Sequence, residues 1–278
     1  MRKYHLCILF LLVMVGNIAT QDSFFAGNFP HLGYGARALA LGEAYTAVAD
    51  DLSALYWNPA GLIQLESNEV LTQKNELAGG LVNQNVITVG QIKLLDGTLA
   101  ASWARISPTS QLYSYVEDTI SLGIARKLGS LGVGLSTKGY RSFLTGDEQD
   151  DEVWGVGLDL GILLKSKLGD FGFTARDLLS YLNYGDSTGD IPREYSVGYA
   201  LNKTDFSLLL GLDKQNEESL FKIGFEQHLF DNIKIRMGRK GESWSGGVGI
   251  SFQNIKLDYA YCSGVLEGLN ITSFRWTF

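Results

Sequence analysis

The chain ends in a segment whose side chains alternate strictly between two kinds. Within residues 270–278, Phe274, Trp276 and Phe278 share one parity, whereas Arg275 and Thr277 share the other. Successive side chains of a β-strand point to opposite faces, so the segment predicts a strand with one aromatic face and one polar face. That division suits a wall strand of a transmembrane barrel, which has lipid on one side and a wet lumen on the other.

The same two-residue period recurs through most of the sequence. Trp244, Val248, Ile250 and Phe252, for example, alternate with serine and glycine. From Ser67 onward we count about fourteen such segments, an even number as in single-chain bacterial barrels. They start near residues 67, 82, 96, 118, 130, 152, 169, 193, 204, 218, 232, 243, 255 and 269. The pattern predicts an all-β fold, a transmembrane antiparallel β-barrel of about 14 strands.

The connections between these segments alternate in length. Short turns built from Gly, Asn and Asp, which adopt positive φ readily, follow every second segment. Examples are residues 96–97, 129–130, 231–232 and 253–254. Longer links are expected over residues 107–117, 142–151, 178–192 and 263–268. This alternation is typical of outer-membrane barrels, and it places the short turns and both chain ends in the periplasm.

Aromatic residues are expected at both ends of the wall, where the two membrane interfaces lie. At the long-link ends they are Trp154, Tyr195, Trp244 and Tyr261, and at the short-turn ends Phe171, Phe206, Phe252 and Phe278. The alternative is a soluble β-sandwich. It would have to bury these outward faces, and the opposite faces are too small and too charged to form a second core.

The N-terminus predicts export from the cytoplasm. Arg2 and Lys3 precede an apolar run from Leu6 to Val15 and then small residues, so we interpret residues 1–20 as a cleaved signal peptide. A membrane anchor is the alternative, but the run is shorter than a spanning helix requires. Without this segment the net charge falls from −7 to −9. Such an acidic chain argues against nucleic acid as a partner.

Residues 33–62 differ from the rest of the chain because they are dense in Ala and Gly and lack alternation over most of their length. Asn58-Pro59 fits a turn or the start of a helix, with Asn as cap and Pro fixing φ. A barrel of about fourteen strands needs something to fill its lumen. We therefore expect a small N-terminal lumenal plug with the motif Asn58, Pro59, Ala60 and Gly61. The expected domains are a signal peptide over 1–20, a periplasmic or plug segment over 21–66, and an outer-membrane barrel over 67–278.

The stretch from Gly35 to Leu62, with Asn58-Pro59-Ala60, resembles the N-terminal signature of the PorV/PorQ family, which is related to FadL-type outer-membrane transporters. The segments 157–161 and 248–261 are also similar to that family. The resemblance implies passive uptake of small hydrophobic molecules across the outer membrane. It leaves open an accessory role in type IX-like protein secretion, with secretion-system proteins as partners, and a structural barrel without conduction.

The location implies outer-membrane lipid and lipopolysaccharide as partners, together with the barrel-assembly machinery. The terminal aromatic residues Phe274, Trp276 and Phe278 are the expected assembly signal. The acidic run 147–152 lacks the spacing of a calcium-binding loop, so we interpret it as a solvated surface loop.

Several charged residues are expected to face the lumen from neighbouring strands. The cations are Lys222, Lys234, Arg236, Lys256 and Arg275, and the carboxylates opposite them are Asp159, Glu226 and Asp258. They would form either a charged constriction that selects solutes or a lattice of ion pairs that holds the plug, and we favour the lattice. No Gly-x-Ser-x-Gly motif is present, and one Cys and two His remain after residue 20. We expect no enzyme activity, no cofactor and no metal.

Overall fold

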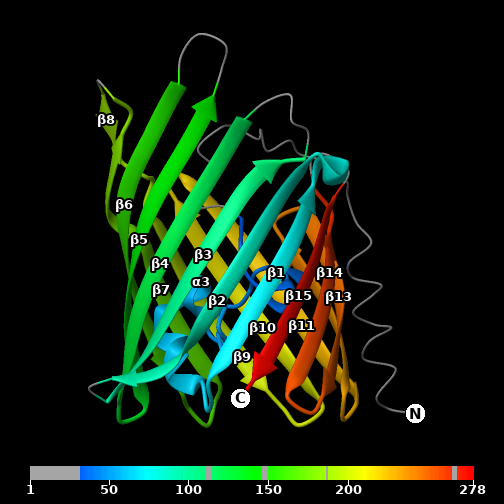
Figure 1. The fold of residues 1–278 in the computed structure, drawn as a ribbon. Helices are drawn as coiled ribbons and strands as arrows, with labels where there is room; N and C mark the ends of the chain where they lie inside the picture. Colours follow the sequence, from blue (N-terminus) through cyan, green and yellow to red (C-terminus); the bar gives the residue numbers. More distant parts are fainter. Residues whose placement is uncertain (1–31, 95, 110–113, 146–149, 186, 265–267) are drawn as a thin grey trace.

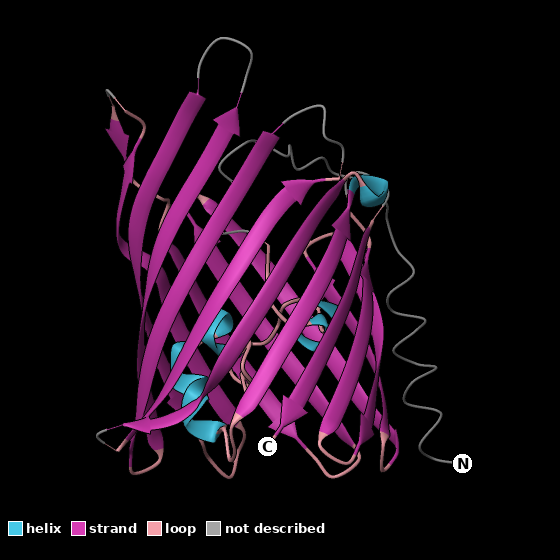
Figure 2. Ribbon diagram, in the orientation of Figure 1, coloured by secondary structure: helices cyan, strands magenta, loops and turns pink. Residues whose placement is uncertain are grey.

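The computed structural model describes residues 32–94, 96–109, 114–145, 150–185, 187–264 and 268–278, so the expected signal peptide lies outside the described residues. The described chain forms one closed antiparallel β-barrel (Figure 1). Three short helical segments lie within it (Figure 2). No helix in this part of the chain is long and apolar enough to cross a membrane.

Fourteen strands make the wall, in agreement with the number predicted. They are β1 Glu69–Leu77, β2 Val82–Leu94, β3 Gly97–Pro108, β4 Ser114–Leu128, β5 Leu131–Thr145, β6 Asp150–Leu164, β7 Asp170–Asn183, β9 Glu194–Asn202, β10 Phe206–Gln215, β11 Glu218–Phe230, β12 Ile233–Lys240, β13 Ser243–Phe252, β14 Ile255–Cys262 and β15 Leu269–Thr277. A two-residue strand, β8 Thr188–Gly189, pairs with β7 outside this ring.

Neighbouring wall strands follow one another in sequence, as expected for hairpins joined end to end. The seam is the pairing of the first wall strand with the last. There β1 and β15 run antiparallel from Glu69 opposite Thr277 to Glu76 opposite Asn270. The backbone N–H of Phe278 extends this ladder by donating to the carbonyl oxygen of Asn68 at 2.9 Å. The backbone ladder of the described wall therefore runs from strand to strand around the whole ring, as a lipid-exposed backbone requires.

The two faces of the wall differ as the alternation predicts. On β15, Phe274, Trp276 and Phe278 are exposed on the outer face, whereas Ser273 and Arg275 are buried on the inner face. Six of the eight predicted interface aromatics are exposed on the outside, namely Trp154, Tyr195, Trp244, Phe171, Phe252 and Phe278, and Phe206 and Tyr261 are half-buried. This outward apolar surface is that of a wall in lipid.

The wall is uneven in height, which the sequence did not predict. β4, β5 and β6 each have 15 residues, whereas β12 and β14 have 8. Much of the chain that we expected in long links at 107–117, 142–151 and 178–192 is therefore paired strand. The expectation failed because polar and acidic residues interrupt the apolar alternation there, while the backbone pairing continues. The ends of β4–β6 project beyond the rest of the rim (Figure 1).

One strand carries a marked irregularity. Between Leu158 and Leu160 of β6 lies a single residue, Asp159, whereas the partner strand β7 has three residues between Leu179 and Ala175. Asp177 in this bulge has a φ of 49°, the left-handed region that non-glycine residues seldom adopt. Its backbone N–H donates to Oδ1 of Asp159 at 2.9 Å, so the bulge is held by a hydrogen bond.

The described residues that precede β1, from 33 to 65, lie inside the barrel (Figure 2). Here we call residues 33–65 the lumenal segment. It contains α2 Ala36–Ala40, α3 Ala54–Trp57 and the 3-10 helix η1 Pro59–Gln64. A second 3-10 helix, η2 Ala78–Gly80, joins β1 to β2 and belongs to the wall. Most apolar residues of the lumenal segment are buried, and together they form the main hydrophobic cluster of the molecule.

Candidate functional site in the barrel lumen

The lumenal segment is anchored at one end by the motif Asn58-Pro59. Asn58 caps η1, since its side chain accepts a hydrogen bond from the backbone N–H of Ala60, and Pro59 occupies the first turn. The Asn58 amide also donates to the carbonyl oxygen of Thr46 and to that of Ile162 on β6. The sequence therefore predicted the helix start, and the structure adds that the same side chain ties η1 to the wall.

Glycines of the wall make this close approach possible. A Cβ placed on Gly161 would lie 2.3 Å from Oδ1 of Asn58, and one on Gly134 would lie 2.3 Å from the backbone N of Ala60. On the opposite side, a Cβ on Gly238 would lie 1.9 Å from the backbone N of Gly42. Any larger residue would push the segment away from the wall. The small inward residues of the strands thus mark where the lumenal segment touches the wall.

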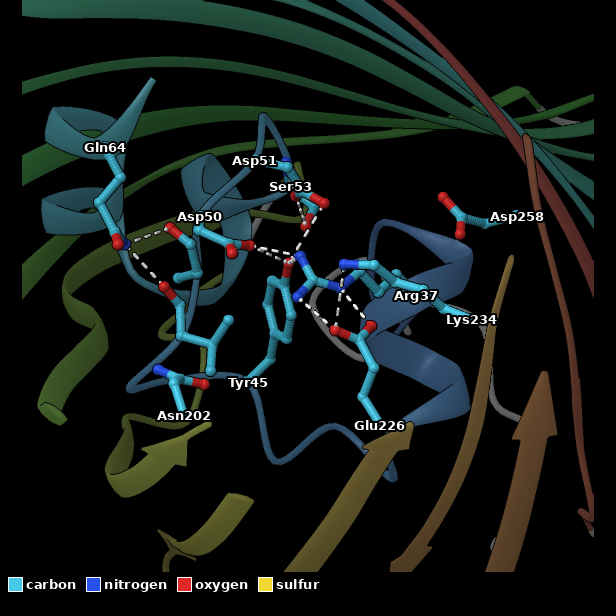
Figure 3. A network of polar contacts seen from close by, with 12 residues as sticks. Arg37, Tyr45, Asp50, Asp51, Ser53, Gln64, Asn202, Glu226, Lys234 and Asp258 are labelled. Carbon is cyan, nitrogen blue, oxygen red and sulfur yellow. Dashed lines mark hydrogen bonds and ion pairs between the residues drawn. The ribbon is translucent and has the colours of Figure 1, made fainter. Parts of the chain in front are cut away.

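Arg37 of α2 is the centre of a polar network (Figure 3). Its Nε and Nη2 donate to the two carboxylate oxygens of Glu226 on β11 at 2.9 and 3.1 Å. Its Nη1 donates to Asp50 and, at 3.0 Å, to the hydroxyl of Tyr45. Glu226 also accepts from Arg236 on β12 at 2.6 Å. A guanidinium that pairs with two carboxylates in a buried setting fixes α2 against the wall.

Two further carboxylates of the lumenal segment pair with wall cations. Glu43 lies 2.9 Å from Nζ of Lys240 and 3.2 Å from Nζ of Lys222. Burial alone would raise the pKa of Glu43, but these two ammonium groups lower it to about 2. Asp51 lies 3.3 Å from Nη1 of Arg275 on β15. Ion pairs from β11, β12 and β15 therefore hold one side of the segment.

An aromatic group covers another part of the segment. The rings of Tyr34 and Tyr56 stack with centroids 4.7 Å apart, and Tyr56 meets Trp57 edge-on at 4.8 Å. The guanidinium of Arg176, on β7, lies over both Tyr56 and Trp57 at 4.9 and 5.6 Å from the ring centroids. It also pairs with Glu194 on the neighbouring strand. The lumen therefore contains a cluster of aromatic rings, and the cation next to them, Arg176, is already paired with a carboxylate.

The structure brings most of the predicted lumenal charges together. Lys234, Arg236 and Glu226 form one group, to which Arg236 adds Asp258 at 2.6 Å. Lys222 and Arg275 pair with Glu43 and Asp51 of the lumenal segment, as above. These residues therefore form ion pairs with one another and with the lumenal segment. Their role in transport stays a prediction.

Two of the predicted lumenal charges lie apart from that group. Asp159 pairs with Lys138 of β5 at 2.9 Å rather than with any cation we named, so the expected pairing was wrong for this residue. Asp177, in the β7 bulge, also lies 3.3 Å from Nζ of Lys138. Lys256 shares a face with Asp258 but lies exposed near the turn after β13.

Sequence reasoning missed the charges contributed by the lumenal segment. Arg37, Glu43, Asp50 and Asp51 stand out as the charged residues in an Ala- and Gly-rich stretch, a signal that was present in the sequence. Lys138 alternates inward on β5 between Ser136 and Tyr140 and was equally visible. In the described residues, no group of three or more His, Cys, Asp or Glu side chains is placed to hold a metal ion.

No family model and no curated protein matches the sequence. Solved structures do match in fold. A toluene transporter of Pseudomonas putida, TodX, superposes with a TM-score of 0.65 at 12% identity, covering 88% of this chain and 99% of the other. The toluene transporter TbuX of Ralstonia pickettii gives 0.63 at 13% identity, covering 88% and 98%. A FadL homologue of Pseudomonas aeruginosa gives 0.54 at 11% identity, covering 85% and 93%.

These matches extend over more of the chain than the fourteen wall strands occupy. They show that the fold is that of a FadL-type barrel, a transmembrane antiparallel wall with residues ahead of its first strand included in the likeness. The identity is too low to carry more than the fold. Nothing among the matches singles out the PorV/PorQ branch of the resemblance.

Proposed function

We propose that this protein is a FadL-like outer-membrane channel for the passive uptake of small hydrophobic molecules. The observation that supports it most is the content of the lumen. A porin has a polar, water-filled interior. The wall of this protein instead encloses an apolar and aromatic segment. The charges around that segment are engaged in ion pairs, as Arg37, Glu43 and Arg275 show. Such an interior favours apolar solutes over ions.

The fold neighbours support the same proposal, because the proteins that share this architecture are described as toluene transporters and a monoaromatic hydrocarbon channel. By analogy we take a small aromatic hydrocarbon as the first solute to test. The lumenal segment acts as the plug in this proposal, and solute passes when the segment shifts against the wall. An exported chain with a cleaved signal peptide at 1–20, delivered to the outer membrane by the barrel-assembly machinery, is part of the proposal.

The test uses a disulfide that locks the lumenal segment to the wall. A Cβ on Gly198 would lie 3.3 Å from Cβ of Ala47, slightly less than the separation across a disulfide, so a small outward shift of the segment brings the two positions to bonding geometry. The variant Ala47→Cys/Gly198→Cys, with Cys262→Ala to remove the native thiol, is expressed in cells that have no such channel of their own. The initial rate of radiolabelled toluene uptake is measured in oxidised and reduced cells.

We expect toluene uptake above that of cells carrying an empty vector, a fall to the vector level on oxidation, and recovery on reduction. The matched control is the single variant Gly198→Cys in the same background, which cannot form the lock and should be indifferent to the oxidant. Uptake that never exceeds the vector level would overturn the channel proposal. Uptake that is equal in both redox states would overturn the role of the segment as plug.

A second proposal is the accessory role in secretion that the resemblance to PorV/PorQ proteins implies. It is supported by the projecting ends of β4–β6, which offer a strand surface above the rim for a protein partner. Deleting the gene in the native host distinguishes the two proposals. A secretion component would lower the amount of exported protein at the cell surface and leave toluene uptake unchanged.

A further inference from the structure

The outer face of β3–β6 carries an apolar groove of about 480 Å³. The residues that line its sides are Leu99, Ala101, Leu122, Ile124, Leu135 and Leu158. Their side chains lie on the lipid-facing side of the wall, since Leu122 and Leu135 are exposed while Gly123 and Ser136, the next residue on each strand, are buried. The groove is therefore a feature of the membrane surface of the barrel, separate from the lumen.

Small residues continue from the groove toward the projecting end of these strands. The strand register aligns Ala101, Leu122, Thr137 and Leu158 in one row across the four strands. The next row toward the rim consists of Trp103, Ile120, Gly139 and Val156. A Cβ on Gly139 would meet no atom within 4 Å, so a gap remains in the middle of that row. The small residues Ala101, Thr137 and Gly139 leave a track that continues from the groove.

A row of charged and aromatic residues lies where this track ends. The register places Arg105, Asp118, Arg141 and Trp154 side by side on β3, β4, β5 and β6. Arg105 pairs with Asp118 at 2.8 Å, and Nε of Arg141 lies 2.7 Å from Glu152. The Arg141 side chain is 61% exposed. The track from the apolar groove thus leads to an exposed guanidinium.

The height of this row matches a membrane interface. Arg126, near the tight turn after β4, and Asp118 are eight residues apart on the outer face of that strand. With about 3.3 Å per residue and a tilt of about 40°, they are separated by about 20 Å along the membrane normal, close to the thickness of the apolar band of such barrels. The side chains between them, Ile120, Leu122 and Ile124, are exposed and apolar. Arg105 and Arg141 therefore lie at the headgroup level opposite the tight turns.

We propose that this face binds an acyl lipid with a phosphate-bearing headgroup from the outer leaflet. One acyl chain lies in the groove and along the Gly139 track, and the phosphate contacts Arg141, while Arg105 lies two strands away and is paired with Asp118. The proposal rests on the proposed outer-membrane location and orientation, and it is independent of hydrophobic uptake.

The charges favour a phosphate over an uncharged headgroup. A planar guanidinium donates two parallel hydrogen bonds to phosphate, a geometry that hydroxyl headgroups do not match. The pair of Arg141 with Glu152 is exposed on both sides, so it contributes little and is readily exchanged for a phosphate. Trp154 in this row and Trp103 in the adjacent row have amphipathic rings suited to the interface, and the indole N–H of Trp103 donates to Asp118 at 2.8 Å. The groove and the row together recognise the two ends of one lipid.

The test measures binding of diphosphoryl lipid A to the delipidated full barrel by native mass spectrometry. Arg141→Gln removes the headgroup contact and Gly139→Leu fills the track. The matched control is Arg126→Gln, because Arg126 is equally exposed at 62% and also pairs with a carboxylate, but lies at the other end of the strand. The same glycolipid stripped of its phosphates is the second probe. Heat-modifiable migration verifies that each variant is folded.

We expect Arg141→Gln and Gly139→Leu each to raise the Kd by about tenfold, the ratio for one lost charge-assisted hydrogen bond or a comparable loss of chain contact. Arg126→Gln should bind as the unaltered barrel does, and the dephosphorylated glycolipid should bind about tenfold more weakly. An equal loss in Arg126→Gln, unchanged binding in Gly139→Leu, or equal binding of both glycolipids would each overturn the proposal.

Discussion

At the scale of single residues, the lumen is organised by charges that cross from the lumenal segment to the wall. Arg37 links Glu226 to Asp50, and Glu43 draws in two lysines from β11 and β12. All of these side chains except Asp50 are buried or half-buried, so each of them carries a desolvation cost that its partner offsets. Removing one partner is then more harmful than the number of lost contacts suggests.

Substituting Glu226 tests this directly. Glu226→Gln leaves the guanidinium groups of Arg37 and Arg236 without their shared carboxylate, and we expect the free energy of unfolding to fall by about 3–5 kcal/mol. Lys74→Gln breaks an exposed pair with Glu76, for which we expect about 0–1 kcal/mol. Urea unfolding in lipid vesicles measures both. Equal small losses in the two variants would show that the network does not stabilise the barrel.

The pKa of Glu43 predicts a pH dependence of the lumenal segment. Its pKa lies at about 2 in the folded chain, below its ordinary value of 4.5, so its pairs with Lys222 and Lys240 stabilise the fold fully above pH 4.5. That contribution is lost as the pH falls from 4.5 toward 2. Hydrogen exchange of residues 36–44 should therefore accelerate over this window. Glu43→Gln should remove that pH dependence, and a curve unchanged by the substitution would contradict the assignment.

For Lys222, Glu226, Arg236, Asp258 and Arg275 the sequence predicted an inward side chain, because side-chain parity follows from the alternation alone. It did not predict their partners, since partners come from the lumenal segment and from strands that only the closed wall brings together. Asp159 shows the limit. Its pairing with Lys138 depends on the β7 bulge, and no two-residue pattern indicates an insertion of that kind.

At the scale of elements, the starts of all fourteen wall strands were predicted to within a few residues, because strong alternation and Gly or Asn turns coincide. The rim was not predicted. The outer faces of β4–β6 become polar near the rim, and in the sequence this polar composition predicts a loop rather than a strand. The interior course of the lumenal segment was also beyond sequence reasoning, because short Ala-rich helices are set by contacts with the wall glycines rather than by propensity.

Two glycines of the wall provide a matched comparison. Gly161→Ala places a methyl group 2.3 Å from Asn58 Oδ1, so we expect η1 to shift and the free energy of unfolding to fall by about 1–3 kcal/mol. Gly139→Ala meets open space on the outer face and should be neutral. Protease sensitivity near residues 58–64 and urea unfolding measure the pair. A neutral Gly161→Ala would mean that the wall and η1 separate without cost.

The last strand tests the assembly signal. Phe278→Ala keeps the backbone hydrogen bond to Asn68 and removes only the terminal ring. A loss of assembly in this variant would therefore come from the missing aromatic ring that the assembly machinery recognises. We expect less heat-modifiable barrel in the outer membrane and protease-sensitive protein in the periplasm. Phe252→Ala removes an equally exposed ring at the same end of β13 and should assemble at the ordinary level. Ordinary assembly of both variants would count against a signal in β15.

At the scale of the whole molecule, wall and lumenal segment have separate sources of stability. Every wall strand pairs with its two neighbours through backbone hydrogen bonds, and none pairs with the lumenal segment. The two parts meet only through side chains and close backbone contacts. The wall should therefore form without its contents.

Deleting residues 22–56 tests this independence and the proposed plug together. The shortened protein should insert as a heat-modifiable barrel, because its inter-strand ladder is intact. Its single-channel conductance in planar bilayers should exceed that of the full protein, since a wall of fourteen strands is too wide to be filled by its own side chains. A conductance no higher than that of the full chain would place the passage elsewhere.

The seam between β1 and β15 sets an order of events during biogenesis. Its register joins Glu69 to Thr277, nearly the full length of the wall sequence, so this pairing carries the largest loop-closure entropy of any in the ring. Hairpins between consecutive strands can form long before it. The lumenal segment is tethered directly to β1, one edge of the still-open sheet. It is therefore enclosed as that edge meets the other, and never has to thread through a finished ring.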